Sequence, residues 1–158
     1  MNKYIPLALA VLLSACGFRL AGSDPAVSAE LSQRVWAVQG GAMQQVLETE
    51  LLRRHARVDN AFAGALLQVK DVQTRRDIHS INLSGTVKEY MLVLRVKAEV
   101  RFEGRETVHP LDVTVRRPLD YHDRDILGKQ EEEALLWAEM RVDAAEQLVR
   151  RLGYLKAE

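Results

Sequence analysis

The chain of 158 residues contains a single cysteine, so no disulfide can form within it. Its 22 basic and 22 acidic residues cancel, and the overall charge therefore gives no indication of a nucleic-acid partner. No hydrophobic run reaches the roughly 20 residues that a membrane-spanning helix needs. A chain of this length can bury a core without disulfides or metals. We expect one domain, preceded by a short N-terminal segment of different character.

Motifs that carry chemistry are also scarce. The sequence has no GxxxxGK[ST] or GxGxxG loop for nucleotide phosphates, and its four histidines show no metal-binding spacing. The densest polar cluster, Asp120 to Asp125, lacks the glycine and distal glutamate of an EF-hand loop. A hydrolase that uses His122 in this loop is kept only as a third hypothesis. We expect no enzyme activity, no cofactor and no metal.

The N-terminus has the layout of a secretory signal peptide, predicted to span residues 1–15. Lys3 gives a positive start, Ile5 to Leu13 is almost wholly apolar, and Ser14 and Ala15 are small residues at the end of the run. Pro6 makes a membrane-spanning helix less favourable. The pattern predicts that the protein is exported, which disfavours a nucleic-acid ligand.

The only cysteine directly follows this apolar run. Leu13-Ser14-Ala15-Cys16 resembles the bacterial lipobox, in which the cysteine becomes the acylated first residue of the mature chain. Several acyl chains anchor a protein stably, whereas one chain binds a membrane only marginally. Gly17, rather than aspartate, follows the cysteine, which favours the outer membrane over the inner membrane. The alternative is an ordinary signal peptide with an incidental cysteine.

Residues 16–30 are small and polar and are predicted to form a tether, and residues 31–158 form the domain. The residue periodicities predict six elements. These are a strand over about Gln33–Val38, a helix over Ala42–His55, strands over Ala65–Ile78 and Glu89–Phe102, a strand ending at Pro118, and a helix over Lys129–Leu152. The predicted fold class is α+β, with two helices packed on one face of a four-stranded, mixed and mainly antiparallel sheet.

The strand over Glu89–Phe102 gives the clearest pattern. Apolar residues from Leu94 to Phe102 alternate with Arg95, Lys97, Glu99 and Arg101, so one face is buried and the other is wet. A short turn at Gly104 leads to a partner strand, which predicts an antiparallel hairpin.

Basic residues gather on and around this wet face. The candidates for binding an anion are Arg95, Lys97, Arg101, Arg116, Arg117 and Lys129, with Arg75 and Arg76 nearby. Arginine binds phosphate and carboxylate in a bidentate manner, and lysine binds them as a point charge. The alternative is a hydrated sheet face, partly neutralised by Glu99 and Asp112.

Three segments of the chain resemble the LptE family of lipopolysaccharide-assembly lipoproteins. Cys16 to Leu20 matches the CG[FW]xL start of the mature family sequence, and Glu89-Tyr90 precedes an alternating strand as in the family's central hairpin. Asp143 to Leu152 is similar to its AAEQL[IV]R[RK]L final helix. The resemblance covers essentially the whole mature chain.

The resemblance implies an outer-membrane lipoprotein that is not an enzyme. Members of the family plug the LptD β-barrel, help it to assemble and bind lipopolysaccharide, whose lipid A phosphates suit a basic surface. It implies the same fold of two helices on a four-stranded sheet. It also assigns lipopolysaccharide contact to Lys129, before the final helix, whereas Leu83 stands at the family's second basic position. The alternative is a scaffold lipoprotein that faces the periplasm and binds no ligand.

Overall fold

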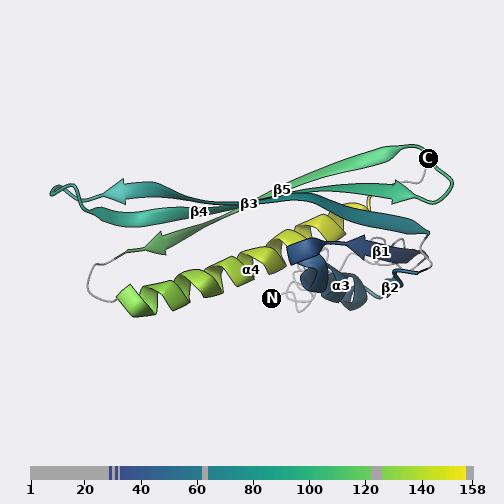
Figure 1. Cartoon of the computed structure of the whole chain (residues 1–158), viewed down its shortest axis with the longest axis horizontal. Coiled ribbons are helices and arrows are strands. Elements are labelled where there is room, and N and C mark those ends of the chain that lie inside the picture. Colours follow the sequence, from purple (N-terminus) through teal and green to yellow (C-terminus); the bar gives the residue numbers. More distant parts are fainter. Residues whose placement is uncertain (1–28, 30, 32, 62–63, 122–125, 156–158) are drawn as a thin grey trace, which may run out of the picture.

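The structure is a computed structural model that describes residues 29, 31, 33–61, 64–121 and 126–155. Its elements, shown in Figure 1, are β1 (Val35–Gln39), the short 3-10 helix η1 (Gly41–Met43), α3 (Gln44–Arg53), β2 (Arg57–Val58), β3 (Ala65–Ile81), β4 (Val87–Phe102), β5 (Val108–Asp120) and α4 (Ile126–Leu152). The predicted signal peptide, the tether over residues 16–30 with Cys16, and most of the Asp120–Asp125 loop lie outside the described residues.

The five strands form one mixed sheet in the order β2-β1-β3-β4-β5. β1 is parallel to β2 and β3, whereas β3, β4 and β5 form an antiparallel meander. The α+β class is confirmed, but the predicted count of four strands was wrong. The missed strand, β2, has only two residues, Arg57 and Val58, and is too short to show any periodicity.

Both helices cover the same face of the sheet, and the core lies between the two layers (Figure 1). Leu94, Val96 and Val100 of β4 are buried as their alternation predicted. From α4, the stripe of Met140, Ala144, Leu148 and Leu152 is buried against them. Among the described helices, none has the length and apolar character needed to cross a membrane.

Strand β5 runs past the proline that was predicted to end it. It continues to Asp120, and Pro118 pairs in register with Met91 of β4. Proline is tolerated here because β5 is an edge strand, where its missing N–H removes no bond if the nitrogen faces outwards. The predicted strand end was wrong because the sequence pattern does not show that this strand lies at the edge of the sheet.

One charged pair is buried between the helices, against expectation. The helical pattern of the sequence places Arg54 on the polar face of α3 with Gln44, Gln45 and Glu48, which predicts exposure to solvent. The structure shows it 7% exposed instead, with its Nε atom 2.9 Å from the Oε1 atom of Glu50. The helix turn that ends α3 brings Arg54 inwards, and its Nη2 atom lies 3.6 Å from Glu146 of α4. A buried charge requires such partners, because burial removes its hydration.

Candidate functional site

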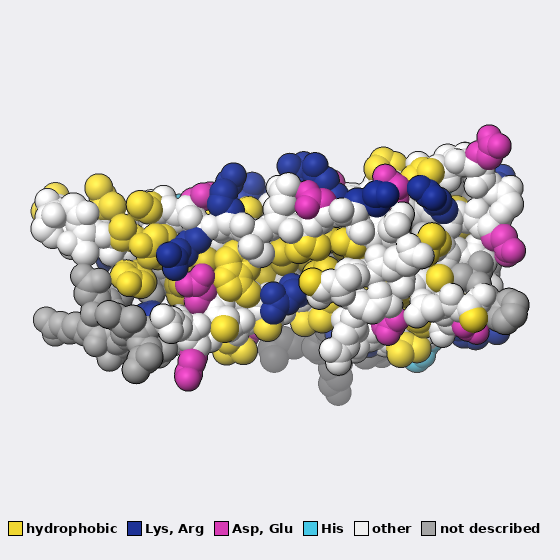
Figure 2. All heavy atoms as spheres, in the orientation of Figure 1, with side chains coloured by type: hydrophobic (Ala, Val, Ile, Leu, Met, Phe, Trp, Pro, Cys, Tyr) yellow, Lys and Arg dark blue, Asp and Glu magenta, His cyan; other side chains and the backbone are white. Residues whose placement is uncertain are grey.

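The face of the sheet opposite the helices carries a group of basic side chains. Residues that pair across neighbouring strands lie on the same face of the sheet. Arg75 of β3 and Arg116 of β5 both pair with Val93 of β4, which lies two residues before Arg95. We define the basic sheet face as Arg75, Arg95, Lys97, Arg101 and Arg116. Figure 2 shows Lys and Arg side chains along the top of the molecule, on the side away from the helices, with Asp and Glu between them.

Three of these arginines surround a hollow of about 490 Å³. Arg75, Arg95 and Arg116 reach it from three adjacent strands, and Thr74, Gln73 and Thr114 also line it. Guanidinium groups and hydroxyl groups are hydrogen-bond donors that suit phosphate oxygens. The strand register therefore assembles, from three sequence segments, a site that can hold an anion.

Acidic residues neutralise part of this face. Arg95 binds Asp112 through Nε at 3.0 Å and through Nη2 at 2.5 Å. The hydrogen bond from Arg95 lowers the pKa of the Asp112 carboxyl, and nearby positive charge lowers it further. Asp112 is therefore ionised at neutral pH, and an incoming anion must compete with it for Arg95. This agrees with the alternative of a neutralised, hydrated face for one arginine.

Other members of the basic sheet face differ in how they are paired. The Nε atom of Arg75 lies 2.9 Å from Asp77, and the Nη2 atom of Arg101 lies 3.5 Å from Glu99. The side chain of Arg116, which is exposed, makes no hydrogen bond or ion pair within the part of the chain that the structure describes. It is therefore the guanidinium group on this face that is most available to a ligand.

The structure separates two predicted site residues from this face. Arg117 pairs with Leu92, whose side chain lies in the core, so it is on the helix side and forms an ion pair with Asp143 of α4. The alternation of a strand explains this, because consecutive residues such as Arg116 and Arg117 point to opposite faces. Lys129 lies in the first turns of α4, where its Nζ atom is 2.6 Å from Glu132.

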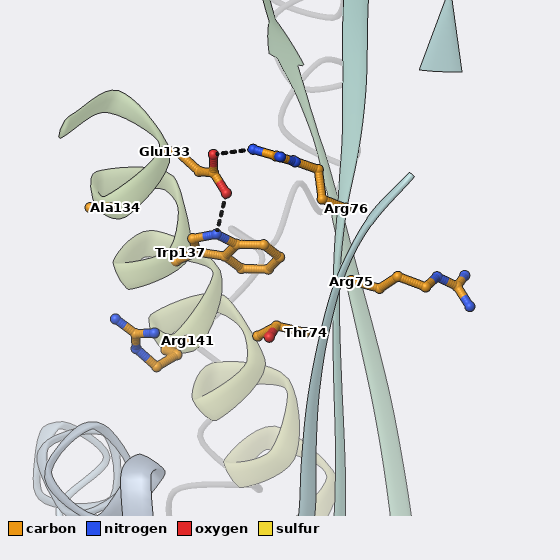
Figure 3. A pocket seen from close by; sticks show the side chains of 7 residues that line it. All are labelled: Thr74, Arg75, Arg76, Glu133, Ala134, Trp137 and Arg141. Atoms are coloured by element: carbon orange, nitrogen blue, oxygen red, sulfur yellow. Dashed lines mark hydrogen bonds and ion pairs between the residues drawn. The ribbon is translucent and has the colours of Figure 1, made fainter. Parts of the chain in front are cut away.

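A second hollow, which the sequence did not predict, lies between β3 and α4. We name it the β3–α4 groove; Thr74, Arg75, Arg76, Glu133, Ala134, Trp137 and Arg141 line it. In Figure 3 the Trp137 indole lies between the helix and the strand, and Glu133 bridges it to Arg76. Glu133 accepts hydrogen bonds from Arg76 at 3.0 Å and from Trp137 Nε1 at 3.1 Å. In the sequence, the i, i+4 spacing of Trp137 and Arg141 on the predicted helix indicates that the two side chains share one helix face, but it does not indicate a groove.

Four described candidates line neither hollow: Lys97, Arg101, Arg117 and Lys129. Cys16 and His122 lie outside the described residues, although Asp120 and Tyr121 at the start of the loop are described. Within the described ranges, no group of three or more His, Cys, Asp or Glu side chains is arranged to hold a metal ion.

The chain is similar to known proteins over most of its length. The model of the family described as "LptE: Lipopolysaccharide-assembly" matches residues 28–152. The chain is 36% identical over 152 residues to the LPS-assembly lipoprotein LptE of Pectobacterium atrosepticum, covering 92% of this chain and 82% of that protein. It is 34% identical over 152 residues to the LptE protein of Yersinia enterocolitica, covering 92% of this chain and 72% of that protein.

Solved structures show the same fold. An uncharacterized lipoprotein B from Nitrosomonas europaea superimposes with a TM-score of 0.69 at 28% identity, covering 87% of this chain and 90% of that one. The rare lipoprotein B from Shewanella oneidensis gives a TM-score of 0.67 at 22% identity, covering 76% of this chain and 94% of that one, and supports the fold alone. Because the family model and relatives above 30% identity both span most of the sequence, the chain belongs to the LptE family of lipopolysaccharide-assembly lipoproteins.

Proposed function

We propose that this protein is a non-catalytic outer-membrane lipoprotein that plugs the LptD β-barrel, assists its assembly and binds lipopolysaccharide. The observation that carries the binding part of the proposal is the hollow formed by Arg75, Arg95 and Arg116 on the basic sheet face. In an LptE family member, a site for phosphate oxygens fits the phosphates of lipid A. Lys129, at the start of α4, is proposed as a separate contact.

The geometry favours a phosphate group over a simple counter-ion. Arginine presents its donors in a planar fork, so two guanidinium groups can share the oxygens of one phosphate. Arg116 needs no rearrangement to bind, because it has no ion-pair partner among the described residues. Arg95 has to give up hydrogen bonds to Asp112. Arg116 is therefore proposed as the primary contact and Arg95 as a secondary one.

The membrane attachment is proposed to run through Cys16. The lipobox-like Leu13–Cys16 stretch and the preceding apolar run supply the processing signal. Acyl chains on Cys16 would hold the domain at the membrane, with residues 17–30 as the tether.

A scaffold that binds no ligand is the second candidate function. It is favoured by the carboxylates of Asp77, Glu99 and Asp112, which neutralise three of the cations on the basic sheet face. In that case the sheet face would only remain hydrated, and the protein would act as a structural scaffold that faces the periplasm.

The proposed complex is tested by co-expression with LptD and affinity purification of the tagged lipoprotein from detergent-solubilised outer membranes. We expect LptD to co-purify in equal amounts, and the intact mass of the mature lipoprotein to correspond to an acylated chain that begins at Cys16. Purification without LptD would overturn the plug assignment. An unmodified cysteine would overturn the anchor.

The lipopolysaccharide site is tested by the Arg116→Glu variant. We expect its affinity for purified lipopolysaccharide to fall about tenfold, because one charge-assisted contact is lost and a repulsive charge is added. Binding of the wild type should also weaken as the salt concentration rises. The measurement is a fluorescence titration at two ionic strengths, with Lys129→Asp as a further arm for the separate contact.

The matched control is Arg150→Glu, which reverses an exposed charge in the last turn of α4, in the layer opposite the basic sheet face. It should bind lipopolysaccharide like the wild type. Equal weakening by both variants would assign the effect to net charge, and an absence of binding by the wild type would favour the scaffold.

A further inference from the structure

Strand β3 has a long free edge. It pairs with β1 only from Ala65 to Gln68, and beyond that point the edge opposite β4 has no partner strand in the described part of the chain. The free part, Val69 to Ile81, is about 40 Å long at roughly 3.3 Å per residue. A row of unpaired backbone N–H and C=O groups is a template for another strand.

The other long edge of the sheet is protected, whereas this one is not. Edge strand β5 contains Pro110 and Pro118, which cannot donate hydrogen bonds to an added strand. The free part of β3 contains no proline. Its pairing with β4 shifts at Val69/Asp71 and again after Ile78, so the segment Asp71–Ile78 between the bulges is regular. This segment is therefore the part of the sheet that is best prepared to accept a strand.

The β3–α4 groove runs beside this segment. It has a volume of about 540 Å³ and is lined by Thr74 from the middle of the segment and by Trp137 and Arg141 from α4. A groove between a strand edge and a helix is the setting in which extended peptides add to a sheet, with pockets for alternate side chains. Figure 3 shows the Trp137 ring between α4 and β3, and the ring is half-buried.

The charges around the groove indicate the chemistry of the added strand. Arg76 is held by Glu133 and lies over the Tyr90 ring, so its charge is already balanced. The side chain of Arg141 makes no hydrogen bond or ion pair with any residue in the described ranges. A side chain on the helix-facing side of an added strand would contact the Trp137 indole. A carboxylate on the same side of that strand, placed next to the following turn of α4, would contact Arg141.

We propose that the free edge of β3 over Asp71–Ile78 accepts an extended, acidic segment of a partner polypeptide by β-strand addition, with a carboxylate of that segment bound to Arg141. The identity of the partner rests on the proposed function, in which it is LptD. Because the strands of a closed barrel have no free edge, the segment belongs to a loop or terminal extension of LptD rather than to the barrel wall.

The test is residue-resolved amide hydrogen exchange on the full-length lipoprotein, alone and in the co-purified LptD complex. In the free protein, amides of Asp71–Ile78 that point away from β4 should exchange quickly, and in the complex they should slow at least tenfold. The outward amides of β5 serve as the internal control and should change little.

Each outcome separates this inference from the proposed function. A complex that forms without added protection of the β3 edge overturns the inference and leaves the plug assignment intact. Failure of the complex to form overturns both. Protection that is already present in the free protein and rises with its concentration would assign the edge to a second copy of this chain, and would overturn the proposal.

A charge reversal tests the acidic character of the segment. Arg141→Glu should weaken the complex about tenfold and leave thermal unfolding unchanged, because Arg141 has no ionic partner among the described residues. The matched control is Arg57→Glu, an exposed position on β2, which is separated from β3 by β1 and does not line the groove. Equal affinity of Arg141→Glu and wild type for LptD would overturn the carboxylate contact.

Discussion

Replacing Glu50 with alanine is expected to lower the free energy of unfolding by about 3–5 kcal/mol, because it leaves a buried arginine without its main partner. Glu50 is 4% exposed, and its two carboxylate oxygens bind Arg53 and Arg54, each at 2.9 Å. The side chain of Arg53 is largely exposed and can return to water, but Arg54 cannot. The cost therefore arises mostly from the stranded charge of Arg54.

Glu146 of α4 does not replace the lost carboxylate. Its Oε1 atom lies 3.6 Å from the Nη2 atom of Arg54, longer than a good charge-assisted hydrogen bond, and its side chain is 42% exposed. Glu146 therefore stabilises the charge of Arg54 only in part. We expect the decrease in the free energy of unfolding to lie at the lower end of the range. The measurement is urea unfolding followed by far-ultraviolet circular dichroism.

The control removes both charges together. In the double variant Glu50→Leu/Arg54→Met no charge remains stranded, so its stability should lie within about 1–2 kcal/mol of the wild type and above that of Glu50→Ala. A single variant as stable as the wild type would show that Arg54 moves out to water when its partner is lost, and would contradict the structural role of the pair.

The sequence predicted those parts of the fold that depend on a long, regular period. In β4 every second side chain from Leu94 to Phe102 is buried, and in α4 the residues from Met140 to Leu152 at four-residue spacing are buried. Both patterns are set by local geometry, which a sequence records directly. Strand β2 and the continuation of β5 past Pro118 depend instead on the neighbours that the strands find in the sheet.

The candidate site was predicted less completely, for the same reason. Arg95, Lys97 and Arg101 could be placed on one face because they belong to one alternating strand. That Arg75 and Arg116 join Arg95 around one hollow depends on the register between three strands, which periodicity does not specify. Likewise, the pairing of Arg95 with Asp112 is a contact between strands. The two-residue periodicity of a strand predicts that Arg116 and Arg117 lie on opposite faces of the sheet, but the sequence analysis assigned both to one basic cluster.

Replacing Trp36 with alanine is expected to lower the free energy of unfolding by about 3–5 kcal/mol, the range for deleting a large aromatic side chain from a core. Trp36 lies in β1, is 1% exposed, and its Nε1 atom donates a hydrogen bond to the Leu31 carbonyl oxygen at 3.1 Å. Its ring packs edge to face on Phe102 of β4, with the centroids 6.3 Å apart. The variant therefore creates a cavity and also leaves the Leu31 carbonyl with only the longer hydrogen bond from the Arg34 backbone N–H at 3.5 Å.

The conservative variant Trp36→Phe separates these two effects. It keeps an aromatic ring against Phe102 but removes the N–H donor, so we expect a smaller loss of about 1–2 kcal/mol. Because Trp36 lies on the helix side of the sheet, folded Trp36→Phe should bind lipopolysaccharide as the wild type does at the basic sheet face. Equal losses for the two variants would assign the whole effect to the hydrogen bond with Leu31. A change in lipopolysaccharide affinity would instead show that the packing under β1 sets the geometry of the opposite face.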